Sequence, residues 1–332
     1  MKRLIPFFTL ALLSPFIAEI LFGATPLSRS ASLPPLLLLY GGGAVLIREL
    51  ARRTSRPWTT ILFLGAAYCL IEEGIVMQTL FSPDLFGAAA CGARFGGVNW
   101  VWTEELLGYH AVWSIAIPIA LAELCFPKHR DQPWLGRTGV IVALFCYLLG
   151  ALSIGLAFRR IVTPAFRAPL VLLISTALFA AAIVAWALKR KPAAAREEQP
   201  GSPAGIVSPW LAGAVALGAA ILWMQFSRLP QTVRTGLWPL LPMALAAGLA
   251  WYVYRLVTSW VRHDWTDLHR VALIWGAVAA SAAYGVDIIK QAAPVDRIGQ
   301  AACSIAFFAC LALLTRRLKA RGRPTESLNP LK

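Results

Sequence analysis

Residues 58–81 read WTTILFLGAAYCLIEEGIVMQTLF, an apolar run long enough to cross a lipid bilayer as a single helix. Runs of about 17–25 apolar residues recur along the chain without strict alternation, which favours helices over a closed barrel. A spanning segment must satisfy its own backbone hydrogen bonds, and a helix does so internally. The sequence therefore predicts an all-α, polytopic integral membrane protein.

The composition supports this fold class. Hydrophobic residues make up 58% of the chain and charged residues only 14%, whereas soluble domains carry about 25% charged residues. We therefore expect membrane lipid to cover the apolar surface. The net charge is +15, but the basic residues stand at the ends of apolar runs, which indicates membrane orientation and not nucleic-acid binding. The six cysteines form no CxxC pair and are interpreted as small apolar residues.

We place about ten membrane helices, the first of which is interpreted as an uncleaved span and not as a signal peptide. Their approximate bounds are 5–23, 33–51, 58–81, 107–126, 138–158, 166–188, 207–226, 237–257, 270–287 and 298–315. The segment 189–205 (KRKPAAAREEQPGSPAG) reads as a cytoplasmic linker. It separates a six-helix block, residues 1–188, from a four-helix block, residues 206–315, which a basic tail, residues 316–332, follows.

The Lys and Arg residues predict the orientation. With the N-terminus in the cytoplasm, 22 of the 31 basic residues fall in cytoplasmic segments. This bias predicts a multi-pass protein of the cell membrane with both termini cytoplasmic. Three arginines run against the bias, because Arg159, Arg160 and Arg167 then lie in an external loop.

Ionisable residues within membrane helices are costly and are therefore functional candidates. The sequence places eight in or near its spans: Glu19, Arg48, Glu49, Glu72, Glu73, His110, Glu123 and Asp287. With a rise of about 1.5 Å per residue, Glu19 and Glu72 lie about 21 Å from the inner surface and His110 about 23 Å. Three separate helices thus bring carboxyl groups and an imidazole to one level.

Glu72 and Glu73 are the strongest candidates, in the stretch LIEEGIVMQ. Two carboxyl groups this close in a low dielectric are not both expected to be ionised, so one is expected to hold a proton. Such a pair suits a general acid and base or a proton carrier. The structural alternative is that the carboxyls only join helices through hydrogen bonds. For His110 and Glu19, function and helix packing are equally consistent with the sequence.

Two further polar groups receive structural interpretations. Arg48, Glu49 and Glu123 near the cytoplasmic surface are expected to neutralise one another. The motif RHDWTDLHR contains residues that bind metals, namely His263, Asp264, Asp267 and His269, but its arginines favour a solvated connector. The external loop 82–105 is equally consistent with a lid and with a plain connector.

An adjacent Glu pair on one membrane helix with a His on the next resembles the CPBP family of CAAX prenyl endopeptidases and bacteriocin-processing proteins. The resemblance implies an intramembrane hydrolase in which a glutamate activates water, and it covers about residues 58–126. The family's EExxxR would fall on Glu72 and Glu73, but Met77 stands at its Arg position. Its FxxxH would place the His at His110, but Leu106 replaces the Phe, and its HxxxN motif has no counterpart.

The sequence thus favours a membrane hydrolase or peptidase acting on a membrane-embedded peptide or small molecule. Glu73 would be its general base, Glu72 the partner of that base, His110 a proton relay and Glu19 a supporting group. His110 and Glu73 are also the candidate ligands for a divalent metal such as zinc, should one be used. The alternatives are a proton-coupled transporter, whose pathway would include Asp287 and Lys290, and a non-catalytic scaffold. The sequence leaves the substrate and the oligomeric state open.

Overall fold

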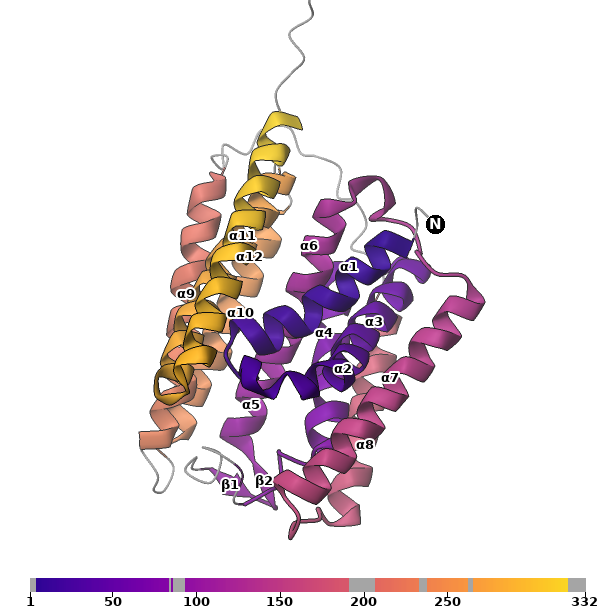
Figure 1. The fold of residues 1–332 in the computed structure, drawn as a ribbon, viewed down its shortest axis with the longest axis vertical. Coiled ribbons are helices and arrows are strands. Elements are labelled where there is room, and N and C mark those ends of the chain that lie inside the picture. The colour runs from indigo at the N-terminus through magenta and orange to yellow at the C-terminus, as the bar shows by residue number, and fades with distance from the viewer. Residues whose placement is uncertain are drawn as a thin grey trace, which may run out of the picture.

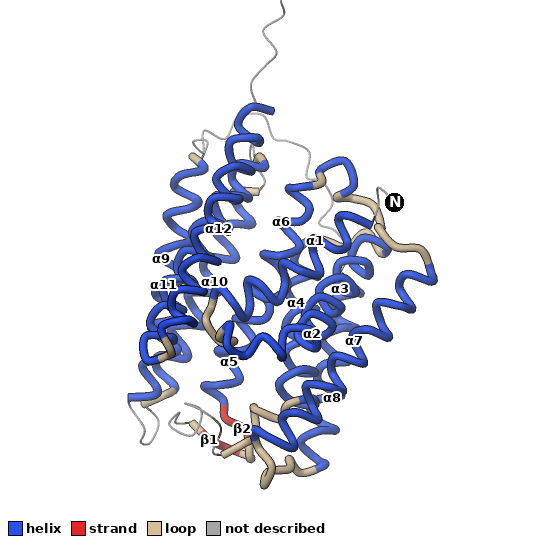
Figure 2. The backbone as a smooth tube through the Cα atoms, viewed as in Figure 1, coloured by secondary structure: helices blue, strands red, loops and turns tan. Residues whose placement is uncertain are grey.

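The computed structural model describes residues 4–83, 85, 93–190, 207–232, 238–261 and 265–321. Within these ranges the chain is nearly all helix with one short β-hairpin (Figure 2). Ten helical stretches of the described chain are long and apolar enough to cross a membrane. The prediction of an all-α polytopic membrane protein is therefore confirmed.

The first six spans contain most of the interruptions in the helices. Their α-helices are α1 (Leu4–Pro15), α2 (Leu33–Leu36), α3 (Gly42–Arg53), α4 (Trp58–Cys69), α5 (Trp100–Tyr109), α6 (Ile117–Cys125), α7 (Arg137–Ala157) and α8 (Leu170–Lys189). Strands β1 (Arg94–Phe95) and β2 (Val98–Asn99) pair antiparallel just before α5. Five π-helical segments extend or join these helices: Phe16–Leu21, Leu37–Gly41, Leu70–Val76, His110–Ala116 and Phe158–Val162.

The last four spans are longer and more regular. They are α9 (Pro209–Thr232), α10 (Leu240–Trp260), α11 (Asp267–Ile288) and α12 (Pro294–Arg321). Short 3-10 helices over Leu27–Ser32, Pro127–His129 and Ile289–Gln291 complete the described elements.

Several predicted boundaries differ from the structure, and two of them lie beside the candidate residues. The fourth span begins at Trp100 and not near 107, because the Asn99 side chain caps the helix by accepting from the Trp102 amide at 3.1 Å. Much of the predicted loop 82–105 is therefore a β-hairpin and the start of α5. The third span ends at Val76 and not at 81, since Gln78 has a left-handed backbone with φ of 63°.

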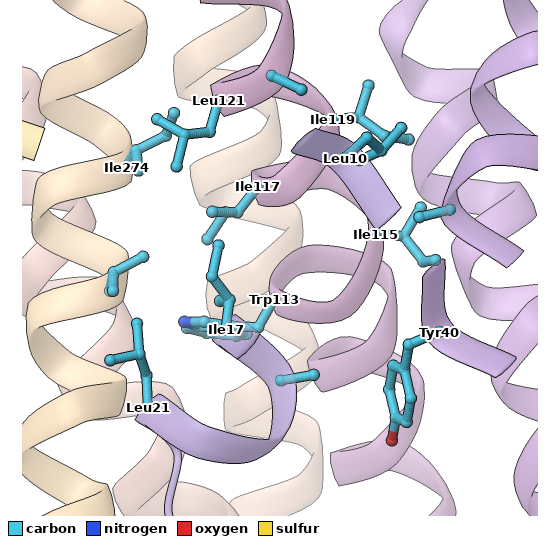
Figure 3. Close-up of a cluster of buried hydrophobic side chains, with 14 of the residues drawn as sticks. Leu10, Ile17, Leu21, Tyr40, Trp113, Ile115, Ile117, Ile119, Leu121 and Ile274 are labelled. Atoms are coloured by element: carbon cyan, nitrogen blue, oxygen red, sulfur yellow. The ribbon is translucent and has the colours of Figure 1, made fainter. Parts of the chain in front are cut away.

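The buried apolar core joins the two blocks of helices. Figure 3 shows Ile17 of the first span beside Trp113 of the fourth, and Ile274 of α11 beside Leu121 of the fourth. Polar contacts reinforce this junction, since the Trp113 indole donates to the carbonyl of Ala277 on α11 at 3.0 Å. The four-helix block is thus packed directly on the six-helix block in the described chain.

The bundle has two distinct ends (Figure 1). We call the end that carries β1 and β2 the hairpin end, and the opposite end the terminal end, because Leu4 and Arg321 both lie there. An even number of spans explains why the described chain begins and ends on one side. Which end faces the cytoplasm stays a prediction from the basic residues.

Candidate functional site

The four site residues expected from the sequence, Glu19, Glu72, Glu73 and His110, lie on π-helical segments. In the described chain, four of the five such segments carry one of these residues or Tyr40, whose ring stacks on His110: Glu19 in Phe16–Leu21, Tyr40 in Leu37–Gly41, Glu72 and Glu73 in Leu70–Val76, and His110 in His110–Ala116. A π-helical turn inserts an extra residue and shifts the helix register, and such turns often occur at functional sites. The π-helical deformations of four spans thus coincide with the site residues that the sequence predicts.

His110 bridges the two adjacent glutamates. Its Nε2 atom lies 3.2 Å from Oε1 of Glu73, and its Nδ1 atom lies 3.4 Å from Oε2 of Glu72. Ser114, one turn farther along the helix, places its Oγ atom 3.1 Å from the same Nδ1 atom. The exposed fraction is 0% for Glu72, 6% for Glu73 and 2% for His110. These three residues, which we call the Glu–His–Glu cluster, are therefore nearly sealed from solvent.

The ring of His110 explains how both glutamates can belong to one site. Adjacent helical residues point about 100° apart, so Glu72 and Glu73 do not share one face. The imidazole has nitrogen atoms on two of its edges, and each edge meets one carboxyl group. The predicted convergence of these residues is thus present, with the histidine between the carboxyls.

The second oxygen of Glu73 is held by a turn that the sequence did not predict. The Thr79 hydroxyl donates to Glu73 Oε2, and the Thr79 amide donates to the Glu73 carbonyl at 2.8 Å. Gln78, with its left-handed backbone, folds the chain back so that Thr79 meets Glu73. Such a conformation is uncommon for a residue other than glycine and costs about 1 kcal/mol or more. The Trp102 indole donates to the Thr79 hydroxyl at 3.4 Å and covers the turn.

Glu19 is held in the same way on the first span. The Thr25 hydroxyl donates to Glu19 Oε2 at 2.6 Å, and the Thr25 amide donates to the Glu19 carbonyl at 3.2 Å. Here the left-handed residue is Gly23, with φ of 77°. Sequence analysis missed both threonines, although each stands six residues after its glutamate. That shared spacing was the available signal.

Aromatic residues line the buried side of the Glu–His–Glu cluster. The Tyr40 ring stacks on the His110 ring at a centroid distance of 5.9 Å, and the Tyr68 ring lies at the same distance. The Tyr68 hydroxyl and both carboxyl oxygens of Glu72 are buried without a hydrogen-bond partner in the described residues. Because unpaired charge is costly in such surroundings, the cluster is expected to be neutral overall, with protons shared among its members.

Other candidates from the sequence lie elsewhere. Asp287 pairs with Lys290 at 2.9 Å in an exposed position, so the contacts described for this pair do not reach the Glu–His–Glu cluster. His263 and Asp264 fall outside the described residues. Asp267 pairs with Arg130 at 2.9 Å, and His269 bonds to Thr266 and to the carbonyl of Val207. These contacts belong to the start of α11, where His269 is buried, so the predicted solvated connector is wrong for His269.

The metal-ligand prediction does not fit the donor set. A zinc ion at a catalytic site usually takes three protein ligands. In the described part of the chain, no group of three or more His, Cys, Asp or Glu residues is arranged to hold a metal. His110 also presents a different nitrogen to each glutamate, so one ion could not take both pairs at once.

A second buried polar cluster lies toward the terminal end. The Arg48 guanidinium contacts Glu123 at 3.2 Å and Glu49 at 3.3 Å, so the predicted Arg–Glu pair is present. Arg52 completes the cluster through Glu123 at 2.6 Å. We call these residues the arginine cluster. Its ion pairs join α3 to α6, which is a structural role.

A family model described as an uncharacterized membrane protein family matches residues 8–328. This family is not the CPBP family, so the comparison supports a membrane protein and not the protease resemblance. No curated protein and no solved structure matches the chain.

Proposed function

We propose that this chain, which belongs to that uncharacterized membrane protein family, is a membrane-embedded hydrolase in which Glu73 acts as the general base. The observation that carries the proposal is the imidazole of His110 held between two buried carboxyl groups. Such an arrangement provides a proton acceptor and a proton donor within one network, which is what acid–base hydrolysis requires.

The reaction follows from the contacts of Glu73. Glu73 takes a proton from a water molecule, whose oxygen adds to the carbonyl carbon of an ester or amide. The bond from that carbon to the leaving oxygen or nitrogen then breaks, and the leaving group takes a proton from protonated His110. The proton on Glu73 returns to His110 across the 3.2 Å contact between Nε2 and Oε1. One water is consumed, an acid and an alcohol or amine are released, and the site is restored.

The neighbours of Glu73 have distinct roles in this scheme. Thr79 fixes one carboxyl oxygen of Glu73 and leaves the other directed at His110. Glu72 stabilises the protonated imidazole from the Nδ1 side, at 3.4 Å. Glu19 acts at longer range as a supporting carboxyl group, because its contact in the described chain is with Thr25.

The test uses purified protein in lipid nanodiscs with two probes, a fluorogenic acyl ester and a quenched peptide. We expect hydrolysis of at least one probe and a loss of about 100-fold or more in Glu73→Gln, because a general base contributes that much. Asp287→Asn, which removes an exposed carboxyl, is the matched control and is expected to keep full activity. A chelator is expected to leave the rate unchanged. Unchanged hydrolysis in Glu73→Gln would refute the proposal.

Proton-coupled transport is the second candidate, and one observation favours it. The Glu–His–Glu cluster contacts no Lys or Arg side chain in the described residues, so no permanently charged side chain fixes its protonation there. Proteoliposomes with an imposed pH gradient test this directly. Proton flux that is lost in Glu73→Gln, with no hydrolysis of either probe, would replace the hydrolase by a transporter. A change in stability alone would favour the scaffold.

A further inference from the structure

Three arginines at the hairpin end have no role in the proposed reaction. Arg159 and Arg160 lie in the π-helical segment Phe158–Val162, which continues α7, and Arg167 lies in the loop that leads to α8. All three are exposed, and in the described chain no acidic side chain pairs with any of them. The neighbouring Ile161 is 78% exposed. This surface thus combines positive charge with apolar side chains.

The loop that bears Arg167 is bonded to the turn that holds Glu73. The Ala168 amide donates to the Gln78 side chain at 2.9 Å, and Gln78 is the left-handed residue that brings Thr79 to Glu73. Phe166 of the same loop packs in an apolar cluster with Leu80. These two contacts therefore join the loop of Arg167 to the turn beside Glu73.

The helices α7 and α8 flank the segment Leu70–Val76, which carries both glutamates. A Cβ atom on Gly155 of α7 would lie 3.2 Å from Val76, and one on Gly74 would lie 2.8 Å from Thr176 of α8. Both helices pack on this segment more than on each other. Ile71, Ile75 and Val76 of the segment stay partly exposed. An acyl chain in the bilayer can therefore lie against the segment that bears Glu72 and Glu73.

The spacing along the helices places the arginines beyond the reacting groups. The third and fifth spans run in the same direction, and Gly155 contacts Val76. Arg159 stands four residues past Gly155, and Glu73 stands three residues before Val76, which puts the arginine roughly 10 Å closer to the hairpin end. In a glycerophospholipid the acyl ester carbonyls lie deeper in the bilayer than the phosphate, just as Glu73 lies deeper than Arg159.

We propose that the substrate of the site is a lipid with an anionic phosphate headgroup, which Arg159, Arg160 and Arg167 bind while its acyl ester lies toward Glu73. This inference rests on the proposed function for the reaction, but the binding step can be measured without turnover. Arginine is suited to the task because its planar guanidinium can donate two hydrogen bonds to one phosphate. Phosphate binding would thus explain why these three arginines lie in a loop that is predicted to be external.

The experiment measures lipid binding by native mass spectrometry of the detergent-solubilised full chain. The probes are dioleoyl phosphatidylglycerol and dioleoylglycerol, which share acyl chains and differ in the headgroup, with inorganic phosphate as a competitor. We expect the double variant Arg159→Gln/Arg160→Gln to bind phosphatidylglycerol about 30-fold more weakly at low ionic strength. Binding by the intact chain should weaken as salt is added. Dioleoylglycerol should bind both proteins equally and weakly, and inorganic phosphate should not displace the bound lipid.

The matched control is Arg316→Gln/Arg317→Gln, another pair of adjacent exposed arginines near the end of a helix, on α12 at the terminal end. It should change the affinity by less than about twofold, and Arg159→Lys/Arg160→Lys should keep most of it. Glu73→Gln should bind the lipid like the unaltered chain, which separates binding from catalysis. Equal affinity in Arg159→Gln/Arg160→Gln, equal loss in the control, or displacement by inorganic phosphate would overturn the inference.

Discussion

Replacing Arg48 by methionine is expected to destabilise the protein by about 3–5 kcal/mol, the usual cost of removing one partner of a buried ion pair. Arg48 has an exposed fraction of 0%. Its guanidinium donates to the backbone carbonyls of Gln132 and Arg130 at 2.7 Å and of His129 at 3.1 Å. Three charge-assisted hydrogen bonds at about 1 kcal/mol or more each already account for most of that figure.

The remaining cost comes mainly from packing. Glu123 keeps Arg52 at 2.6 Å after the change, so its charge is not left unpaired. The Trp134 ring loses the guanidinium that stacks on it at 3.5 Å. Methionine fills much of the volume but donates no hydrogen bond. Lysine at position 48 keeps the charge yet lacks the planar fork, so we expect Arg48→Lys to recover only part of the loss.

The assay is thermal unfolding in detergent, followed by the fraction of monodisperse protein after heating. The control is Arg53→Met on the same helix, because Arg53 is 35% exposed and pairs with Glu49 at 3.2 Å. A partly exposed pair contributes about 1 kcal/mol or less. If Arg48→Met and Arg53→Met unfold at the same temperature, the arginine cluster does not stabilise the junction of α3 and α6, and this reasoning is refuted.

Two further predictions concern packing and orientation. Gly276→Val should destabilise the bundle by about 1–3 kcal/mol through overpacking, because a Cβ atom at this position would lie 2.2 Å from the Gly213 carbonyl oxygen on α9. The control is Gly218→Val, because a Cβ atom on Gly218 would have nothing within 4 Å. This control should be near neutral in the same unfolding assay. For orientation, an alkaline phosphatase fused after Pro164 should be active and one fused after Pro127 inactive, whereas the reverse result would place the hairpin end in the cytoplasm.

The fold and the depth of the candidate residues in the membrane could be predicted because both depend on properties averaged over whole helices. Hydropathy alone gives the ten spans, and a constant rise per residue brings Glu72 and His110 to similar depths. The boundaries at Val76 and Trp100 could not be predicted in this way. They depend on single residues, since one left-handed Gln78 ends the third span and one Asn99 side chain begins the fourth.

The positions of Thr25 and Thr79 show why regular helices mislead at this site. In an unbroken α-helix, a residue six positions on points about 240° away from the first, so neither threonine would meet its glutamate. Both do, because each span passes through a π-helical segment and then a left-handed residue before the chain folds back. The two spans therefore hold a carboxyl group by the same device, with Gly23 in one and Gln78 in the other. A glycine adopts that backbone at little cost, whereas a glutamine does not. Of these two turns, the strained one is therefore the turn beside Glu73, the carboxyl that also contacts His110. This difference favours the third span as the one that carries the functional carboxyl group.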